Sequence, residues 1–474
     1  MPSTNHSTIP HLVANPRRIP SARYYDAAFF ELEREQVWPH VWQMACRLEI
    51  IPEVGDWVEY ANLGKSALIV RTKSGVKAFQ NTCRHRGAQI AGGTGQAHGN
   101  CAKTGFVCPF HGWSWDMDGH NTKVYGRHLF AADELDADDI ELVPIRCETW
   151  GGCAFINYDD HAPGLRETMG PVADRLEAHG VGNMRSEWWF GTVLPANWKV
   201  AMEAFMEGYH VRSTHPQLER IYPGMYVSSY EDADAAVYGA NSMANMIGNS
   251  RQADVRAAIR EQFDHMDMTS VGMAGMFHAK EMDIARSLLE VDLPERLEEA
   301  IPMWYGLVQD QIMTRLRQAG EAVPDLNAVA VSDPVGGVEF MFPHYFMLPV
   351  FTSMASYRVR PLTPETCFFE IWSLTHIAEG RKHEVPLEPT VLPYDSADFP
   401  PIPRQDFSNI PLQQKGLRND GFEFMRLSPH VEGLVSNYNR VLDGYLKGVD
   451  PKKLARATQE LGGNFDGPIK ELDL

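Results

Sequence analysis

Two short loops that pair a cysteine with a histidine constrain this chain more than any other feature. The first is Cys83-Arg84-His85-Arg86-Gly87, and the second is Cys108-Pro109-Phe110-His111-Gly112. Each loop offers one thiol and one imidazole, and its glycine permits the tight backbone turn that a metal site requires. The two loops together predict a metal-binding site, held by a small domain built around it.

Two Cys and two His fit two kinds of metal site. They can hold a tetrahedral zinc ion, or a Rieske [2Fe-2S] cluster with both thiolates on one iron and both imidazoles on the other. A zinc ribbon usually repeats Cys-x-x-Cys or gathers its two histidines at one end. The order Cys-x-His followed by Cys-x-x-His therefore favours the cluster.

A second motif lies within residues 203–216, where Glu207-x-x-His210-x4-His215 is followed by Pro216. On a helix that opens near Pro216, Glu207 and His210 share a face, and His215 can turn toward them. Two neutral imidazoles with a carboxylate from elsewhere form the facial triad that holds ferrous iron and leaves coordination positions open. The alternative is a surface helix with unrelated histidines, and the Cys/His loops upstream weigh against it.

Length and composition limit the possible classes of protein. A chain of 474 residues with 44% apolar and 22% charged residues is ordinary for a soluble protein of two domains, or one domain with a large insert. A net charge of -19 argues against nucleic acid and anionic membranes as partners. No stretch approaches the roughly 20 apolar residues of a membrane span, and the start lacks a secretion signal, so we expect a cytoplasmic protein. Seven scattered cysteines do not suggest a disulfide scaffold.

Apolar periodicity predicts a β-rich region between two helical parts. In the first third we expect a helix at 25–45 and strands at 57–60, 67–71, 76–79, 140–143 and 153–157, with the β region closing near Asp160. We then expect a helix at 163–180, a strand at 188–194, a helix at 198–209, and late strands at 340–351, 353–360 and 366–375. Helices are expected at 406–416, 420–426 and 430–447.

A helical insert is expected at 251–322, with breaks at Pro294 and Pro302. Its methionines either line a pocket or, as is commoner for Met on helices, pack in the core. They are Met266, Met268, Met273, Met276 and Met282.

With both metal motifs in hand, the sequence resembles the α subunits of Rieske non-heme iron ring-hydroxylating oxygenases. The resemblance implies an α+β fold, in which a β-rich Rieske [2Fe-2S] domain is inserted into a helix-grip catalytic domain, an antiparallel sheet around a helix. The implied division is an N-terminal arm and helix at 1–45 that packs with the catalytic domain, a Rieske domain at 46–160 and a mononuclear iron domain at 161–474.

The resemblance also assigns metal ligands. Cys83 and Cys108 match the ligands of one cluster iron, and His85 and His111 those of the other. His210 and His215 match two ligands of the mononuclear iron. The third is an aspartate that follows a glutamine at the start of a late helix, for which Asp406 after Gln405 is the best match. The alternatives are that Asp406 only caps that helix, or that Asp395, Asp398 or Asp420 is the ligand.

Glu207 stands at the place of the acidic residue that links the two metal centres in the family. There it accepts a hydrogen bond from a cluster histidine, here His111, usually across a subunit boundary. Many members have Asp at this place, and Glu is found notably in members that act on quaternary amines. Two further departures are an inserted loop at 96–103, in which Cys101 is expected to be a free surface thiol, and Phe342-Pro343-His344 where many members have Pro-Asn.

The resemblance implies a terminal oxygenase that uses O2, with an apolar pocket beside the iron. The main expectation is cis-dihydroxylation of an aromatic substrate. The alternative is a monooxygenase or demethylase for a quaternary amine or an N- or O-alkyl compound, since aromatic walls also attract such cations. The pocket candidates lie beside the iron motif or on facing strands, and His344 either faces the pocket or bonds to backbone. They are Met202, Phe205, Met206, Phe340, Phe342, His344, Phe346 and Phe351.

Electrons are expected from a partner, because the chain has no Gly-x-Gly-x-x-Gly after a strand for a flavin or nicotinamide. That partner is an NAD(P)H-dependent reductase, with or without a ferredoxin. The family implies a homotrimer of α subunits, with or without a small β subunit. The alternative of another class is a Rieske electron carrier or a zinc-stabilised ligand-binding protein, but a carrier needs no second His pair in a further 300 residues.

Overall fold

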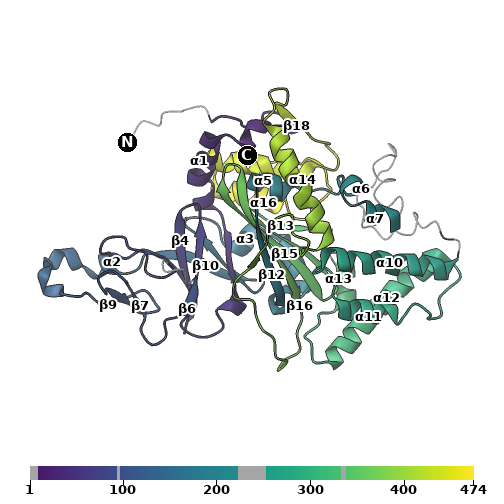
Figure 1. The fold of residues 1–474 in the computed structure, drawn as a ribbon, viewed down its shortest axis with the longest axis horizontal. Helices are drawn as coiled ribbons and strands as arrows, with labels where there is room; N and C mark the ends of the chain where they lie inside the picture. The colour runs from purple at the N-terminus through teal and green to yellow at the C-terminus, as the bar shows by residue number, and fades with distance from the viewer. Residues whose placement is uncertain (1–8, 93–96, 222–251, 253, 333–337) are drawn as a thin grey trace.

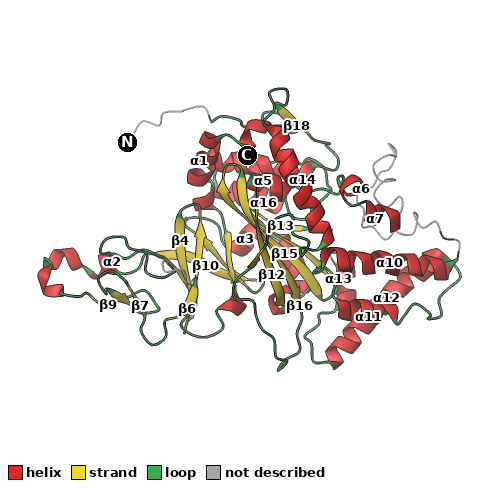
Figure 2. Cartoon of the chain, in the orientation of Figure 1, coloured by secondary structure: helices red, strands yellow, loops and turns green. Residues whose placement is uncertain are grey.

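A computed structural model shows a small β region at one end, a central sheet with covering helices, and a helical region at the other end (Figure 1). It describes residues 9–92, 97–221, 252, 254–332 and 338–474. The helical region consists of α10 (Val255–Met273), α11 (Ala279–Arg286) and α12 (Leu297–Gln318). Helices and antiparallel sheets in separate blocks confirm the predicted α+β class (Figure 2).

Two sheets form the β region within the described part of the chain. The larger is antiparallel throughout, in the order β2 (Gln43–Arg47), β11 (Cys153–Asn157), β10 (Pro144–Trp150), β5 (Gly75–Gln80), β4 (Lys65–Thr72), β3 (Asp56–Asn62) and β6 (His98–Asn100). The smaller contains β7 (Phe106–Val107), β8 (Ser114–Trp115) and β9 (Asn121–Lys123). The strands predicted at 57–60, 67–71, 76–79 and 153–157 are confirmed.

Two predictions in the β region are wrong. The expected strand at 140–143 is not formed, because Ile140 ends the short helix α2 (Ala137–Ile140), whose first turn carries the acidic pair Asp138 and Asp139 that suits a helix start. Cys101 is not a surface thiol: its side chain is 3% exposed and packs in the core of this region. The inserted loop pairs with β3 as β6, and the Cys101 N–H donates to Gly55 O, so the backbone is drawn inward. Burial raises the pKa of Cys101 to about 11.

The central sheet contains six strands in the described residues. Their order is β13 (Glu339–Met341), β14 (Tyr345–Val350), β15 (Ser353–Thr363), β16 (Thr366–Thr375), β12 (Arg185–Leu194) and β17 (Thr390–Val391). All pairs are antiparallel except β12 with β17. The predicted strands at 188–194, 353–360 and 366–375 are confirmed. The single strand expected at 340–351 is two strands, because a turn around Pro343 separates β13 from β14.

Helix α5 (Trp198–Glu203) lies against β15 and β16 and also contacts α14 (Pro401–Leu417). Trp198 and Met202 on this helix are 0% exposed and share one core with Phe346, Tyr357 and Phe369 of the sheet. Burial of each such side chain contributes roughly 1.5–3 kcal/mol. This arrangement, a sheet wrapped around a helix, confirms the predicted helix-grip fold.

Several further helices complete the described structure. They are α1 (Ala27–Gln36), α3 (Leu165–Met169), α4 (Pro171–Ala178), α6 (Val211–Thr214), α7 (Pro216–Ile221), α13 (Leu326–Ser332), α15 (Gly433–Leu446) and α16 (Pro451–Gln459). Helix α1 contacts α15 and shares the core of α5, as expected for an N-terminal helix packed on the catalytic part. None of the helices in the described residues has the length and apolar character to cross a membrane. The predicted domain boundaries stay predictions.

Several helix predictions differ from the structure. The helices expected at 25–45 and 198–209 end early, at Gln36 and Glu203. Pro302 does not break the insert but lies inside α12, whose neighbouring Ala300, Ile301 and Trp304 are buried and hold the helix in place. Residues 420–426 form no helix, because β18 (Phe424–Arg426) pairs with β1 (Arg18–Pro20) of the N-terminal arm. Residues 1–8 of that arm lie outside the described residues.

A buried polar network fixes α5 to α1 and α15. Glu203 at the end of α5 accepts hydrogen bonds from Tyr24 Oη (2.8 Å) and Asn439 Nδ2 (2.7 Å). One helical turn earlier, Lys199 forms a fully buried ion pair with Glu33 of α1 at 2.7 Å. Burial raises the pKa of Glu203 to about 7, although its hydrogen-bond donors and nearby cations oppose the shift. Breaking one partner of such a buried pair leaves an unpaired charge, which is strongly destabilising.

We predict that Glu203→Gln becomes increasingly stabilising as the pH rises from 5 to 8. The folded-state pKa lies above the ordinary value of 4.5, so the folded protein binds more protons than the unfolded chain between these values. The wild type therefore loses stability over this window, by an order of 3 kcal/mol, whereas the amide has no proton to lose. Thermal unfolding followed against pH measures this difference. A parallel pH dependence of the variant and the wild type would contradict it, and Glu35→Gln on the exposed face of α1 is the control.

Candidate active site

His210 and His215 flank α6, a single helical turn. His210 precedes the turn and His215 ends it, with the His215 N–H donating to Val211 O. The following Pro216 disfavours helical backbone at His215, whose φ is -120°. The chain therefore reverses, and the two imidazole rings come to 5.3 Å between centroids.

Glu207 does not share a helix face with His210, contrary to the sequence prediction, because α5 has already ended at Glu203. The bonds from Phe205 N to Met202 O and from Met206 N to Glu203 O tighten the last turn before the chain leaves the helix. Glu207 instead folds back on His210. Its Oε2 accepts from the His210 backbone N–H at 2.9 Å, and its Oε1 lies 2.8 Å from His210 Nδ1.

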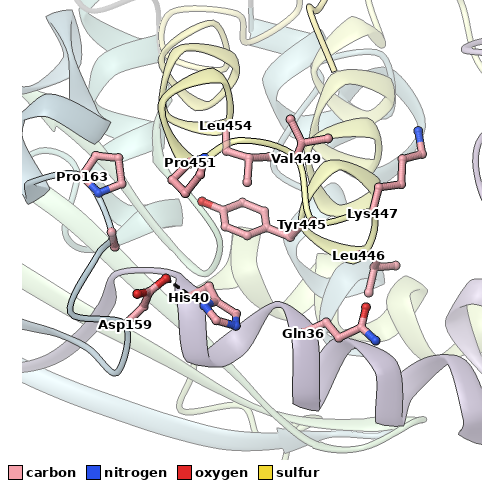
Figure 3. Close-up of a pocket in the computed structure, with 12 residues that line it drawn as sticks. Gln36, His40, Asp159, Pro163, Tyr445, Leu446, Lys447, Val449, Pro451 and Leu454 are labelled. Atoms are coloured by element: carbon pink, nitrogen blue, oxygen red, sulfur yellow. Dashed lines mark hydrogen bonds and ion pairs between the residues drawn. The ribbon is translucent and has the colours of Figure 1, made fainter. Parts of the chain in front are cut away.

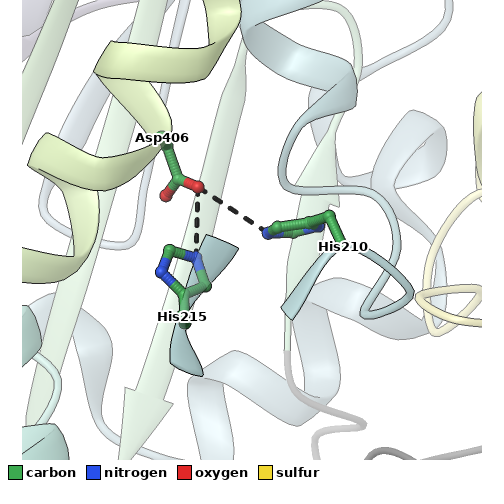
Figure 4. Close-up of side chains that lie close together, drawn as sticks. All are labelled: His210, His215 and Asp406. Atoms are coloured by element: carbon green, nitrogen blue, oxygen red, sulfur yellow. Dashed lines mark ion pairs between the residues drawn. The ribbon is translucent and has the colours of Figure 1, made fainter. Parts of the chain in front are cut away.

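Asp406 completes a three-residue cluster with the two histidines (Figure 4). Asp406 Oδ1 lies 3.1 Å from His215 Nε2 and 3.7 Å from His210 Nε2. One ligand atom from each residue lies within 4.8 Å of the other two. Asp406 is 4% exposed and lies in the second turn of α14, whose N-cap is Pro400, so it does not cap the helix. The competing Asp395, Asp398 and Asp420 are exposed and lie outside this cluster.

Neighbouring side chains orient both imidazoles. His215 Nδ1 lies 2.8 Å from Gln405 Oε1, and Gln217 also donates to that oxygen. With Nδ1–H of His215 donating to Gln405 and Nδ1–H of His210 donating to Glu207, both Nε2 atoms turn their lone pairs toward Asp406. Fixing the ring and tautomer in this way is the usual role of residues around a metal site.

The electrostatics of the cluster suit a cation. Burial lowers the pKa of His210, but the bonded Glu207 and the nearby Asp406 outweigh burial and raise it to about 9. The same negative field that favours a proton on His210 favours a divalent metal in its place. Two imidazoles and one carboxylate on one side of a cavity match the facial triad of ferrous iron sites, so the residues fit the metal that the sequence motif implied.

A cavity of about 210 Å³ adjoins the cluster. Phe205 alone of the predicted pocket residues lines it. Met202 and Met206 are fully buried and do not line it, Phe340 stacks on Phe346, and Phe342 stacks on Tyr445. Phe351 packs against Phe277 in the core of the helical insert. The apolar character of these side chains predicted that they would be buried. It did not predict on which side of the sheet each of them would lie.

His344 does not face the cavity either. Its Nε2 accepts from the Met44 N–H at 3.1 Å, and its Nδ1 lies 3.1 Å from Val359 O. Both ring nitrogens thus bond to backbone, and burial, followed by the charge of Arg358, keeps its pKa well below the ordinary value. His344 joins the β region to the central sheet.

Most residues of the cavity wall were not predicted from the sequence. The helical insert supplies His265, Thr269, Met273, Met276 and Phe277, and the remaining wall includes Leu218, Val338, Leu348, Ile402 and Phe465. Met273 and Met276 were among the methionines considered for a pocket, whereas Met266 and Met282 pack in the core. Burial lowers the pKa of His265 to about 4, so this wall residue is neutral. Phe465 lies in no recognisable sequence motif, so nothing in the sequence indicated that it would line the cavity.

A larger hollow of about 480 Å³ lies between the end of α1, the loop after β11 and the turn from α15 to α16 (Figure 3). Its wall contains His40 and Asp159, whose Nδ1 and Oδ2 lie 2.9 Å apart, together with Tyr445 and Lys447. Among the described lining residues there is no third metal ligand. We therefore place the chemistry in the smaller cavity.

The two Cys/His loops lie side by side at the end of the β region. Each closes with a glycine in the left-handed region, Gly87 at φ 75° and Gly112 at φ 70°, whose N–H donates to the carbonyl of the loop cysteine. The His85 and His111 rings are 4.6 Å apart between centroids. Cys83 and Cys108 are buried beneath them, so two thiols and two imidazoles face each other as pairs.

These loops fit a Rieske cluster. Burial raises the pKa of Cys83, with the backbone N–H groups of His85 and Arg86 opposing the shift and the adjacent Cys108 thiol adding to it. His85 Nδ1 is shielded from solvent and has no hydrogen-bond partner among the described residues. Burial, then His111 and Arg86, lower the pKa of His85 and keep it neutral, as ligation requires. The donor set and the orphaned nitrogen suit the cluster.

We predict that Asp406→Ala removes one iron per chain while the two irons of the cluster remain. The Asp406 carboxylate is the only anionic member of the group formed with His210 and His215, and its loss leaves the two imidazoles as the only ligands of that group. Metal analysis together with the visible absorption of the cluster measures this. Asp398→Ala, an exposed aspartate in the preceding loop, is the control, and equal iron content in both variants would contradict the assignment.

Comparisons with known proteins agree with this geometry. Residues 41–128 match the Rieske [2Fe-2S] domain, and residues 173–448 match the catalytic domain of the ring-hydroxylating α subunits. The chain is 34% identical over 209 residues to the carnitine monooxygenase oxygenase subunit of Escherichia coli K12, which is 43% of this chain and 54% of that protein. It is 31% identical over 206 residues to the glycine betaine monooxygenase oxygenase subunit of Pseudomonas aeruginosa UCBPP-PA14. That match covers 42% of this chain and 45% of that protein. The chain thus spans about half the length of the curated relatives it matches.

The crystal structure of a quaternary ammonium Rieske monooxygenase in complex with L-carnitine has the same fold. Its TM-score is 0.56 at 17% identity, over 92% of this chain and 97% of that one. The catalytic-domain match alone covers more than half of the present chain. These matches, with which the two candidate metal sites and the helix-grip sheet agree, show that the chain belongs to the α subunits of the Rieske non-heme iron ring-hydroxylating oxygenases.

Proposed function

We propose that this protein is a terminal oxygenase that uses O2 and two electrons to oxidise a quaternary amine. The observation that carries the proposal is the cavity beside His210, His215 and Asp406, read with the similarity to carnitine and glycine betaine oxygenase subunits. The cavity volume of about 210 Å³ is below the 300 Å³ at which typical ligand pockets begin, so a small substrate fits better than a polycyclic one.

The cavity wall favours a cationic group. Its charged side chains in the described residues are the carboxylates Glu207 and Asp406, with no Lys or Arg among them. Phe205, Phe277 and Phe465 add aromatic surface, which attracts ammonium groups by about 0.5–2 kcal/mol for each favourable contact. Glu at position 207, noted above for members that act on quaternary amines, points the same way.

The chain's own residues prepare the site. When bound, a Rieske cluster supplies single electrons and a mononuclear ferrous ion activates oxygen beside the substrate. Glu207 and Gln405 hold His210 and His215 in the tautomers that turn Nε2 to the metal. The apolar wall from α10 and the central sheet limits water, which strengthens the electrostatic interactions inside. The electrons would come from an NAD(P)H-dependent reductase, with or without a ferredoxin.

Aromatic ring dihydroxylation, the main expectation from sequence, is less well supported than this alternative. The aromatic side chains of the cavity suit a flat substrate too, and Phe205 lies 4.8 Å from Phe346 and 5.4 Å from Tyr357 between ring centroids. The relatives cited above act on amines, however, and an aromatic substrate carries no positive charge to match the carboxylates at the edge of the cavity. Aromatic hydroxylation is therefore our second candidate function.

We further propose that the tip of the β region is a subunit interface. It exposes Val107, Phe110, Tyr125 and Leu129, of which Phe110 is 63% and Leu129 78% exposed, and the Phe110 ring lies 4.1 Å from that of His111 between centroids. Large exposed apolar side chains mark interaction sites where they gather in a patch. Tyr209, which precedes His210 of the mononuclear iron site in the sequence, is 60% exposed. A second copy seated with its tip on this face would bring its His111 toward Glu207, and head-to-tail contacts of this kind close into a ring such as a trimer.

We predict that a trimethylammonium compound triggers oxidation of the chemically reduced protein in a single turnover. Cluster absorption and product mass are the two measurements, with carnitine, glycine betaine, choline, benzoate and naphthalene as test compounds. The amine is expected to yield a product heavier by one oxygen, or one that has lost an alkyl group. A product heavier by two oxygens from benzoate or naphthalene, with no response to any amine, would establish the second candidate instead.

We predict that Phe110→Asp with Leu129→Asp converts the assembly into single chains. Two carboxylates in an apolar contact each leave a charge without a partner, which costs several kcal/mol. Light scattering measures the mass, and retained cluster absorption shows that the loops are intact. Val391→Asp, equally exposed on β17, is the control. An unchanged mass of the double variant would contradict this interface.

A further inference from the structure

A turn near the C-terminus enters the active site from outside the part of the chain that matches the catalytic domain. The matched residues end at 448. The C-terminal turn, residues 464–467, closes with the Gly467 N–H donating to Asn464 O at 3.1 Å. Phe465 of this turn lines the cavity beside His210, His215 and Asp406. A segment without a recognised motif therefore contributes to the wall of the site.

Asp466 of the same turn reaches the backbone that carries Glu207 and His210. The Gly208 N–H donates to Asp466 Oδ1 at 3.2 Å, and this contact is buried. Residues 204–210 belong to no helix or strand. The Phe205 and Met206 N–H groups still bond back to α5, whereas the Gly208 and His210 N–H groups are held by the side chains of Asp466 and Glu207. Asp466 is 4% exposed and holds a left-handed backbone, φ 53°, which a residue other than glycine adopts only at a cost. A buried carboxylate on a strained backbone indicates that Asp466 has a function at this place, because such strain is kept mainly at functional sites.

The C-terminal turn is itself anchored firmly. The Gly433 N–H at the start of α15 donates to Gly467 O, and the Ile469 N–H donates to Pro429 O. The backbones approach so closely that a Cβ on Gly433 would lie 1.9 Å from the carbonyl carbon of Pro468. Burial raises the pKa of the neighbouring Glu432, and the negative charges of Glu207 and Asp466 add to that rise.

We propose that Asp466 is a positioning residue for the mononuclear iron site, which fixes the 204–210 turn through the Gly208 N–H so that Glu207 can orient His210, while Phe465 forms the adjoining wall. The inference rests on the proposed function only in taking His210 as an iron ligand. A hydrogen bond from a backbone N–H to a carboxylate is among the stronger ones in proteins. Without it the turn gains freedom, and the imidazole of His210 is no longer held in the geometry that binds the metal.

The test compares iron(II) affinity in the full chain, measured anaerobically by competition with a chelator, and it requires no substrate. Asp466→Ala is expected to weaken iron binding at the mononuclear site by about 10-fold, the lower end for residues that support metal ligands. Asp466→Asn retains an acceptor oxygen without the charge and is expected to bind iron more tightly than Asp466→Ala does. Asp473→Ala, on the same segment but exposed in an ion pair with Lys453, is the matched control. Cluster absorption and thermal unfolding verify folding.

Three outcomes would overturn the inference. They are an unchanged iron affinity of Asp466→Ala, an equal loss in Asp473→Ala, and an Asp466→Asn variant as weak as Asp466→Ala, which would show that the charge matters and the hydrogen bond does not. Should Asp466→Ala fail to fold, Asp466→Ser, too short to reach Gly208, takes its place in the same titration. His210→Ala separates this inference from the proposed function: iron retained in that variant would refute the metal site itself, whereas wild-type affinity in Asp466→Ala refutes only the role of Asp466.

Discussion

The convergence of His210, His215 and Asp406 on one point is the constraint on which the rest of the structure depends. The histidines come from a single helical turn, and the carboxylate comes from a helix almost 200 residues later. Three separate features hold these side chains together. Pro216 bends the chain at His215, Glu207 and Gln405 orient the two imidazole rings, and α14, which carries Asp406, packs on α5. The central sheet wraps around α5, and the buried ion pair between Lys199 and Glu33 ties that helix to α1. Several distant segments that meet in one core therefore hold the site in place.

Local motifs made much of this predictable. The glycines of the two Cys/His loops and the spacing of His210 and His215 indicate their chemistry at short range, because neighbouring residues form each turn. The strands at 153–157 and 366–375 follow from apolar runs bounded by turn residues. Asp406 was found only through the resemblance, since nothing in its own neighbourhood distinguishes it from Asp395 or Asp398. The structure separates them by burial.

Long-range contacts account for what the sequence did not show. Cys101 is buried because an inserted loop pairs as β6, and residues 424–426 form a strand because the N-terminal arm pairs with them. The cavity wall shows the same limit. Phe340 and Phe342 are as apolar as Phe205, but their places on β13 and in the turn after it direct them to other parts of the core. Phe465 and Asp466 reach the site because Gly433 lets the C-terminal segment approach α15.

The most direct test of this account is anomalous X-ray scattering from crystals of the protein, recorded at the iron and zinc absorption edges. The account predicts three iron peaks per chain. Two lie between the loops of Cys83, His85, Cys108 and His111, and the third lies at about 2.0–2.2 Å from His210 Nε2, His215 Nε2 and an Asp406 oxygen, the range of metal–nitrogen and metal–oxygen bonds in proteins. A zinc peak between the loops, or a third iron that does not contact Asp406, would contradict it.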